Sequence, residues 1–204
     1  MAGRVGWMAA VAVAAVLTGC GGGGKPATGT FTDSRDGTVY KTVEIGGKRW
    51  FAENLNYDVP NDTLDVCYEN SADSCAKYGR LYTWDAAMKA CPAGYRLPTD
   101  AEWETLVKSA GGSETAGLKL KSASGWNGTN GNGTDDYGFA ALPGGLGRND
   151  SRFYDAGNHG HWWTATKNND EYAAWSREIS YDAHEMFKSD YGIWDFCAVR
   201  CVED

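Results

Sequence analysis

Residues 91–103 read CPAGYRLPTDAEW and contain the clearest helix start in the sequence. Thr99 and Glu102 match the capping box, in which two side chains and two backbone N–H groups at a helix N-terminus satisfy one another. Gly111 supplies a helix stop. Between these signals the apolar side chains recur at helical spacing and are Trp103, Leu106, Val107 and Ala110. This stretch therefore predicts a helix that packs one face on a core.

A second, shorter helix is predicted directly before this segment. Its N-cap is Thr83, and Pro92 stops it, because proline has no N–H for the helical ladder. The apolar positions fall at i, i+3, i+4 and i+7, and they are Trp84, Ala87, Met88 and Cys91.

Strand signals lie on both sides of the two helices. Val39, Val43 and Ile45 share one strand face, Gly46-Gly47 suits a two-residue hairpin turn, and 48–52 returns. Three strand-like runs follow at 161–166, 172–181 and 196–202, while 56–80 and 111–136 are polar or glycine-rich and are interpreted as loops. The pattern predicts an α+β fold with two short helices packed on short antiparallel strands and long loops.

The N-terminus carries a targeting signal. Arg4 precedes an apolar run over 5–17, and Leu17-Thr18-Gly19-Cys20 resembles a bacterial lipobox. We therefore expect a signal peptide over 1–19, acylation of Cys20 as an anchor in the lipid bilayer, a glycine-rich tether over 20–30, and a folded domain over 31–204. This predicts a lipid-anchored protein of the bacterial cell envelope, in the outer membrane, periplasmic or surface-exposed. The alternative is a soluble secreted protein with an incidental cysteine.

Composition limits the class of partner. The chain has 204 residues, which suits one domain with a short appendage, and a formal net charge of −8. An acidic balance of this size argues against nucleic acid as a partner, because phosphates select basic surfaces.

Apart from the predicted anchor, five cysteines remain, and a secreted domain favours disulfides. Cys67 and Cys75 close a short polar loop and are predicted partners. Cys197 and Cys201 lie four residues apart in an extended stretch, about 13 Å, which is too far for a mutual disulfide. One of them is therefore expected to pair with Cys91, which leaves one free thiol.

Several ordered segments resemble the Fibrobacter succinogenes major paralogous domain. They are WFAENLNY at 50–57, YGRLYTW at 78–84, CPAGYRLPTDAEW at 91–103, YGFAALPGG at 137–145 and VRCV at 199–202. The stretch 95–103 also resembles a motif of formylglycine-generating enzymes, which share a fold with C-type lectins. The resemblance thus implies a C-type-lectin-like, disulfide-stapled domain in which Cys91 pairs with Cys201. Cys197 departs from the serine-like residue usual in the family and becomes the candidate unpaired thiol.

The sequence contains two candidate metal sites. His159 and His161 would share one face of a strand, but no Asp or Glu lies at metal-ligand spacing, so both are interpreted as a polar entry to that strand. The loop 127–136 is a weak calcium candidate, because side-chain oxygens alternate with glycines. Its candidate ligands are Asn130, Asn132, Thr134 and Asp136; only two carboxylates are present, which favours a plain flexible loop.

Aromatic residues crowd the second half of the chain and suggest a polysaccharide-binding face, since flat rings stack on sugar rings. Adjacent Trp162 and Trp163 must point to opposite sides of a strand, so one of them is expected outside. The candidates for ligand binding are Trp126, Trp162, Trp163 and Trp194. We therefore expect non-catalytic binding without a cofactor other than calcium. The alternatives are a scaffold or display domain for another envelope protein and, less favoured, a formylglycine-generating-type enzyme.

Overall fold

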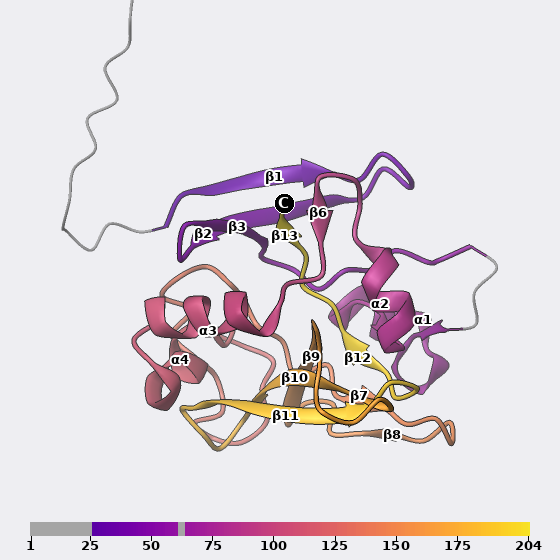
Figure 1. Cartoon of the computed structure of the whole chain (residues 1–204). Coiled ribbons are helices and arrows are strands. Elements are labelled where there is room, and N and C mark those ends of the chain that lie inside the picture. The colour runs from indigo at the N-terminus through magenta and orange to yellow at the C-terminus, as the bar shows by residue number, and fades with distance from the viewer. Residues whose placement is uncertain (1–25, 61–63) are drawn as a thin grey trace, which may run out of the picture.

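The structure is a computed structural model that describes residues 26–60 and 64–204 (Figure 1). The predicted signal peptide, the lipid-anchor candidate Cys20 and most of the predicted tether lie outside the described residues. No helix within the described ranges is long and apolar enough to cross a membrane.

One sheet gathers the two ends of the described chain. Its strand order is β1 (Thr28–Thr32), β2 (Val39–Ile45), β3 (Lys48–Phe51), β13 (Val202–Glu203) and β6 (Tyr95–Arg96). Gly46 and Gly47 both have positive φ, 64° and 76°, which the predicted two-residue β2–β3 turn requires. Strand β1 begins at Thr28, three residues before the predicted domain boundary at Phe31.

A second sheet forms the other side of the molecule (Figure 1). Its order is β11 (Met186–Gly192), β10 (Ala173–Ser180), β9 (His159–Lys167), β12 (Cys197–Ala198), β5 (Leu81–Tyr82) and β4 (Asp65–Val66). The two-stranded β7 (Leu146–Gly147) and β8 (Phe153–Tyr154) lie beside it, and Gly147 joins Phe196 through two backbone hydrogen bonds of 2.8 and 2.9 Å.

The described residues contain four α-helices, so the α+β class is confirmed and the predicted number of helices is too small. They are α1 (Ala72–Tyr78), α2 (Trp84–Ala90), α3 (Asp100–Ser109) and α4 (Ser113–Leu120), with a 3-10 turn η1 (Tyr68–Asn70). The two predicted helices are α2 and α3, and α3 has both halves of its capping box. Helices α1 and α4 lie in segments interpreted as loops. Their many polar and glycine residues leave no clear helical spacing of apolar residues in the sequence, although each helix buries some of its side chains.

Both faces of β9 are covered by hydrophobic clusters. Trp162 packs with Trp50 and Trp103 in one cluster, and Trp163 packs with Tyr82 and Trp84 in the other. Both indoles are 0% exposed. The expectation that one of these rings faces solvent is therefore wrong: alternation separates the two side chains, but each side of the strand has its own core.

A buried arginine joins distant parts of the chain. Arg200 is 0% exposed and donates to Asn54 Oδ1 at 2.7 Å and to the carbonyls of Phe51, Phe139 and Ala140 at 3.1, 2.6 and 2.9 Å. Burial lowers the pKa of Arg200 to about 9. Asn54 also accepts the Trp162 indole N–H at 2.8 Å. We call Asn54, Trp162 and Arg200 the buried hub.

The structure contains the two expected disulfides, Cys67–Cys75 and Cys91–Cys201. The second closes a separation of 110 residues and ties the end of α2 to the segment before β13. Cys197 is the free cysteine among the described residues and is fully buried.

Candidate functional site

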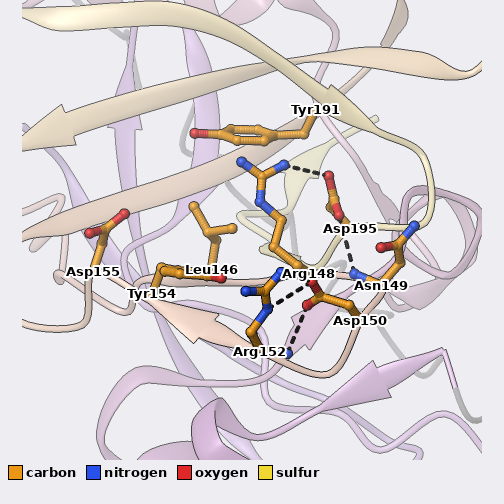
Figure 2. Close-up of a pocket in the computed structure, with 9 residues that line it drawn as sticks. All are labelled: Leu146, Arg148, Asn149, Asp150, Arg152, Tyr154, Asp155, Tyr191 and Asp195. Atoms are coloured by element: carbon orange, nitrogen blue, oxygen red, sulfur yellow. Dashed lines mark hydrogen bonds and ion pairs between the residues drawn. The ribbon is translucent and has the colours of Figure 1, made fainter.

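A polar pocket of about 540 Å³ lies at the edge of the second sheet (Figure 2). Strands β7, β8 and β11 supply part of its walls, and the charged groups come from the β7–β8 loop and from the residues that follow β8 and β11. We call it the Arg148 pocket; its lining residues are Leu146, Arg148, Asn149, Asp150, Arg152, Tyr154, Asp155, Tyr191 and Asp195.

Arg148 and Asp195 form an ion pair in this pocket. Arg148 donates to Asp195 Oδ2 at 2.8 Å, and the backbone N–H of Asn149 donates to the other carboxylate oxygen at 3.3 Å. The guanidinium lies 5.0 Å from the centre of the Tyr191 ring, and Figure 2 shows it directly beneath that ring. Burial raises the pKa of Tyr191, so its hydroxyl stays protonated at neutral pH. The wall therefore presents fixed donors and acceptors.

The other end of the Arg148 pocket is more exposed to solvent. Arg152 forms an ion pair with Asp150, which sits two residues before it, and its guanidinium lies 5.9 Å from the Tyr154 ring centre. Tyr154 is 38% exposed. This combination offers one open aromatic face beside charged hydrogen-bonding groups.

Two exposed aromatic rings stack on each other, one just before β10 and one just after β11. Tyr172 and Trp194 are 54% and 52% exposed, and their ring centres lie 5.6 Å apart at an angle of 23°. The Ile193 N–H donates to the Tyr172 carbonyl at 2.9 Å, which holds the two backbones together. Trp194 lies next to Asp195 of the Arg148 pocket in sequence. We call Tyr172 and Trp194 the aromatic ledge.

Of the four tryptophans predicted to bind ligand, only Trp194 is exposed. Trp162 and Trp163 are interior, as described above. Trp126 is 5% exposed, and its indole N–H is shared by Ser122 Oγ at 3.1 Å and the Ala141 carbonyl at 3.0 Å. The prediction for Trp126 is therefore also wrong: a glycine-rich loop places this ring in the core rather than on the surface.

Two of the four calcium candidates form hydrogen bonds to residues outside the loop 127–136. Asn132 Oδ1 accepts the Trp126 backbone N–H at 3.1 Å, and Thr134 Oγ1 lies 3.5 Å from the Leu118 carbonyl it bonds. Asn130 and Asp136 are exposed. Calcium binding at Asn130, Asn132, Thr134 and Asp136 stays a prediction.

The two histidines have an acidic partner that the sequence interpretation missed. Glu178 on β10 lies opposite His161, and its Oε1 is 2.7 Å from His159 Nδ1. At one end of the strand pair, Ala174 lies opposite Lys167. If this register continued, Ser180 would lie opposite His161. An irregularity between Ala174 and Ser176 shifts the register, so that Glu178 lies opposite His161 instead. Sequence spacing could not reveal this partner, because a β-bulge changes the register of everything beyond it.

Cys197 lacks the properties of a reactive thiol. It is 0% exposed, and burial raises its pKa well above the ordinary value. A nucleophilic cysteine must be a thiolate and must be accessible. Cys197 therefore behaves as a small apolar core residue.

Comparison with known protein families matches residues 43–203 to the Fibrobacter succinogenes major domain. The chain belongs to this family. No curated protein and no solved structure matches it. The buried hub explains several of the family-like segments in this Fibrobacter succinogenes major domain. Asn54, Phe139 and Arg200 come from three of them and meet at one set of buried hydrogen bonds. These segments maintain the fold, whereas the Arg148 pocket is built from residues outside them.

Proposed function

We propose that the chain is a lipid-anchored protein of the bacterial cell envelope whose domain binds polysaccharide without catalysis. The aromatic ledge carries this proposal, because it exposes about half of two stacked rings, and Trp194 directly precedes Asp195 of the polar pocket in sequence. Sugars combine apolar ring faces with many hydroxyls, so they suit an aromatic surface next to fixed carboxylates, amides and guanidinium groups.

The parts have separate tasks in this proposal. Trp194 and Tyr172 offer ring faces on which a sugar can stack. Asp195 and Arg148 are already oriented by each other, so they can bond hydroxyls with little loss of side-chain entropy. Asn149 is exposed at the rim and adds an amide.

A C-type-lectin-like fold is part of the proposal. The disulfide that ties the end of α2 to the C-terminal strand segment supports it, as this is the pairing implied by the resemblance. The burial and protonation of Cys197 favour binding over formylglycine-generating chemistry, which needs reactive cysteines in a substrate groove.

The test is a pull-down of the full chain, purified in detergent, on insoluble cellulose, chitin and xylan. We expect binding to one of them, with loss of at least about tenfold in affinity for Trp194→Ala and Tyr172→Ala. Phe187→Ala is the matched control, because Phe187 is 41% exposed but belongs to neither the ledge nor the pocket. Equal binding by all three variants would overturn the assignment of the ledge.

Calcium and EDTA separate the remaining candidates in the same assay. Binding that EDTA abolishes would move the site to the loop 127–136. No binding to any polysaccharide would overturn the proposed ligand and favour a display domain for another envelope protein. Cys20→Ser tests the anchor independently: the protein should move from the membrane fraction to the soluble fraction.

A further inference from the structure

A cluster of potential metal ligands lies on one face of β9 and β10. His159, His161 and Glu178 each offer one ligand atom, and these atoms all lie within 4.8 Å of one another. Within residues 26–60 and 64–204, this is the single group of three or more His, Cys, Asp or Glu side chains gathered so closely. The strand geometry produces it: residues two apart on β9 share a face, and Glu178 is the cross-strand neighbour of His161.

We propose that His159, His161 and Glu178 form a binding site for a divalent transition-metal cation of the zinc class. Two imidazoles and one carboxylate match the three-ligand sets of open zinc sites, which keep a fourth position for water. The proposal is independent of polysaccharide binding.

The distances suit capture of such an ion with small side-chain movements. Glu178 is central: its two oxygens lie 2.7 Å from His159 Nδ1 and 3.8 Å from His161 Nδ1. Ligand atoms around tetrahedral zinc lie about 3.4 Å apart. The imidazole rings are parallel within 3°, with centres 5.7 Å apart, so they lie side by side on one face of β9.

Burial differs across the cluster in a way that suits a metal site. The side chains of His159 and Glu178 are 28% and 18% exposed, which leaves an entry path, whereas His161 is 2% exposed at the floor. His161 Nε2 is buried and has no hydrogen-bond partner among the described residues.

Neighbouring groups fix the orientation of the ligands. Ser189 Oγ donates to Glu178 Oε2 at 3.1 Å, and the Tyr191 hydroxyl lies 3.2 Å from His161 Nδ1. The Ser189 contact orients the carboxylate, whereas the Tyr191 hydroxyl must give up its contact when His161 Nδ1 binds the ion. The nearby positive charge of Arg148 is paired with Asp195. Its repulsion of a cation is therefore reduced.

The test is equilibrium dialysis of the full chain against Zn²⁺ after treatment with EDTA. We expect one tightly bound Zn²⁺ per chain and a higher melting temperature with Zn²⁺ than with EDTA. His159→Gln and Glu178→Gln should weaken binding at least about tenfold, since each removes one of three ligands. His161 is left unchanged because it is buried, so its substitution would also perturb the core.

The matched control is His184→Gln, because His184 is the remaining histidine, is exposed and lies outside the cluster. This variant should bind Zn²⁺ as the wild type does. Melting temperatures of all variants in EDTA establish that they are folded. Absence of Zn²⁺ binding, or binding lost in His184→Gln and kept in His159→Gln, would overturn the site.

Discussion

Two pairs of aromatic side chains, Trp162 with Trp163 and Tyr172 with Trp194, have opposite roles in this domain. Trp162 and Trp163 are fully buried, and their indole N–H groups donate to Asn54 Oδ1 at 2.8 Å and to the Tyr82 carbonyl at 2.7 Å. Tyr172 and Trp194 are half exposed and stack on each other. The first pair lies inside a strand with cores on both faces, while the second flanks the ends of β10 and β11. Topology, not residue type, decides which rings are free to bind.

The largest expected effect is on the interior pair. Trp162→Ala should lower the free energy of unfolding by about 3–5 kcal/mol, because it leaves a cavity and removes a donor from Asn54. Denaturant unfolding checks this value. A loss below about 1 kcal/mol would mean that Trp162 is not the core residue described here.

The buried hub should give the next largest effect. Asn54→Leu keeps the approximate side-chain size but leaves Arg200 Nε, the Trp162 indole N–H and the Tyr78 carbonyl without their partner. We expect a loss of about 2–3 kcal/mol in the free energy of unfolding. Asn56→Leu is the matched control, since the buried Oδ1 of Asn56 has no hydrogen-bond partner among the residues that the structure describes. Equal losses in both variants would contradict the hub.

A smaller and pH-dependent effect is expected at the start of α3. Bonds from Arg96, and further bonds from Thr99, lower the pKa of Glu102 to about 2. An unfolded glutamate titrates near pH 4.3. The carboxylate therefore stabilises the fold fully above about pH 4.3, and this contribution is lost as the pH falls towards 2.

Glu102→Gln should thus cost about 1 kcal/mol at pH 7 and almost nothing near pH 2. Unfolding curves across this pH range measure the difference. Glu104→Gln on the same helix is the control, because the Glu104 side chain is 62% exposed and its contact to Arg177 is 3.4 Å. A pH-independent loss in Glu102→Gln would contradict the role of its charge.

The smallest expected change in stability is at the aromatic ledge. Trp194→Ala should change the free energy of unfolding by less than about 0.5 kcal/mol, since exposed positions outside the core tolerate truncation. The same variant is expected to lose polysaccharide binding. Comparable destabilisation by Trp194→Ala and Trp162→Ala would remove the contrast between the two pairs.

Local signals predicted the local structure well. The Thr99–Glu102 capping box, the Gly46-Gly47 turn and the short Cys67–Cys75 link are decided by residues within eight positions of each other. Helix α4 was missed because its buried residues, Ala116 and Leu120, stand among polar and glycine neighbours.

Long-range features of the candidate site could not be predicted from sequence. Arg148 and Asp195 are 47 residues apart and meet only because Gly147 bonds Phe196. A register shift in the β9–β10 pairing brings Glu178 opposite His161, and no residue type in the sequence predicts this shift. Exposed Trp194 and buried Trp126 have similar glycine-containing neighbourhoods, so composition alone could not separate a binding ring from a core ring.

The position of the segment Cys197–Glu203 has a consequence for how quickly the domain forms. Strand β12 lies between β9 and β5, and β13 lies between β3 and β6, so both sheets are completed by residues near 200. Contacts of such long sequence separation make folding slow, because the intervening chain must lose its freedom first. Before these long-range contacts form, either Cys197 or Cys201 can pair with Cys91. Oxidative refolding should therefore pass through a mispaired species that a Cys197→Ala variant cannot make.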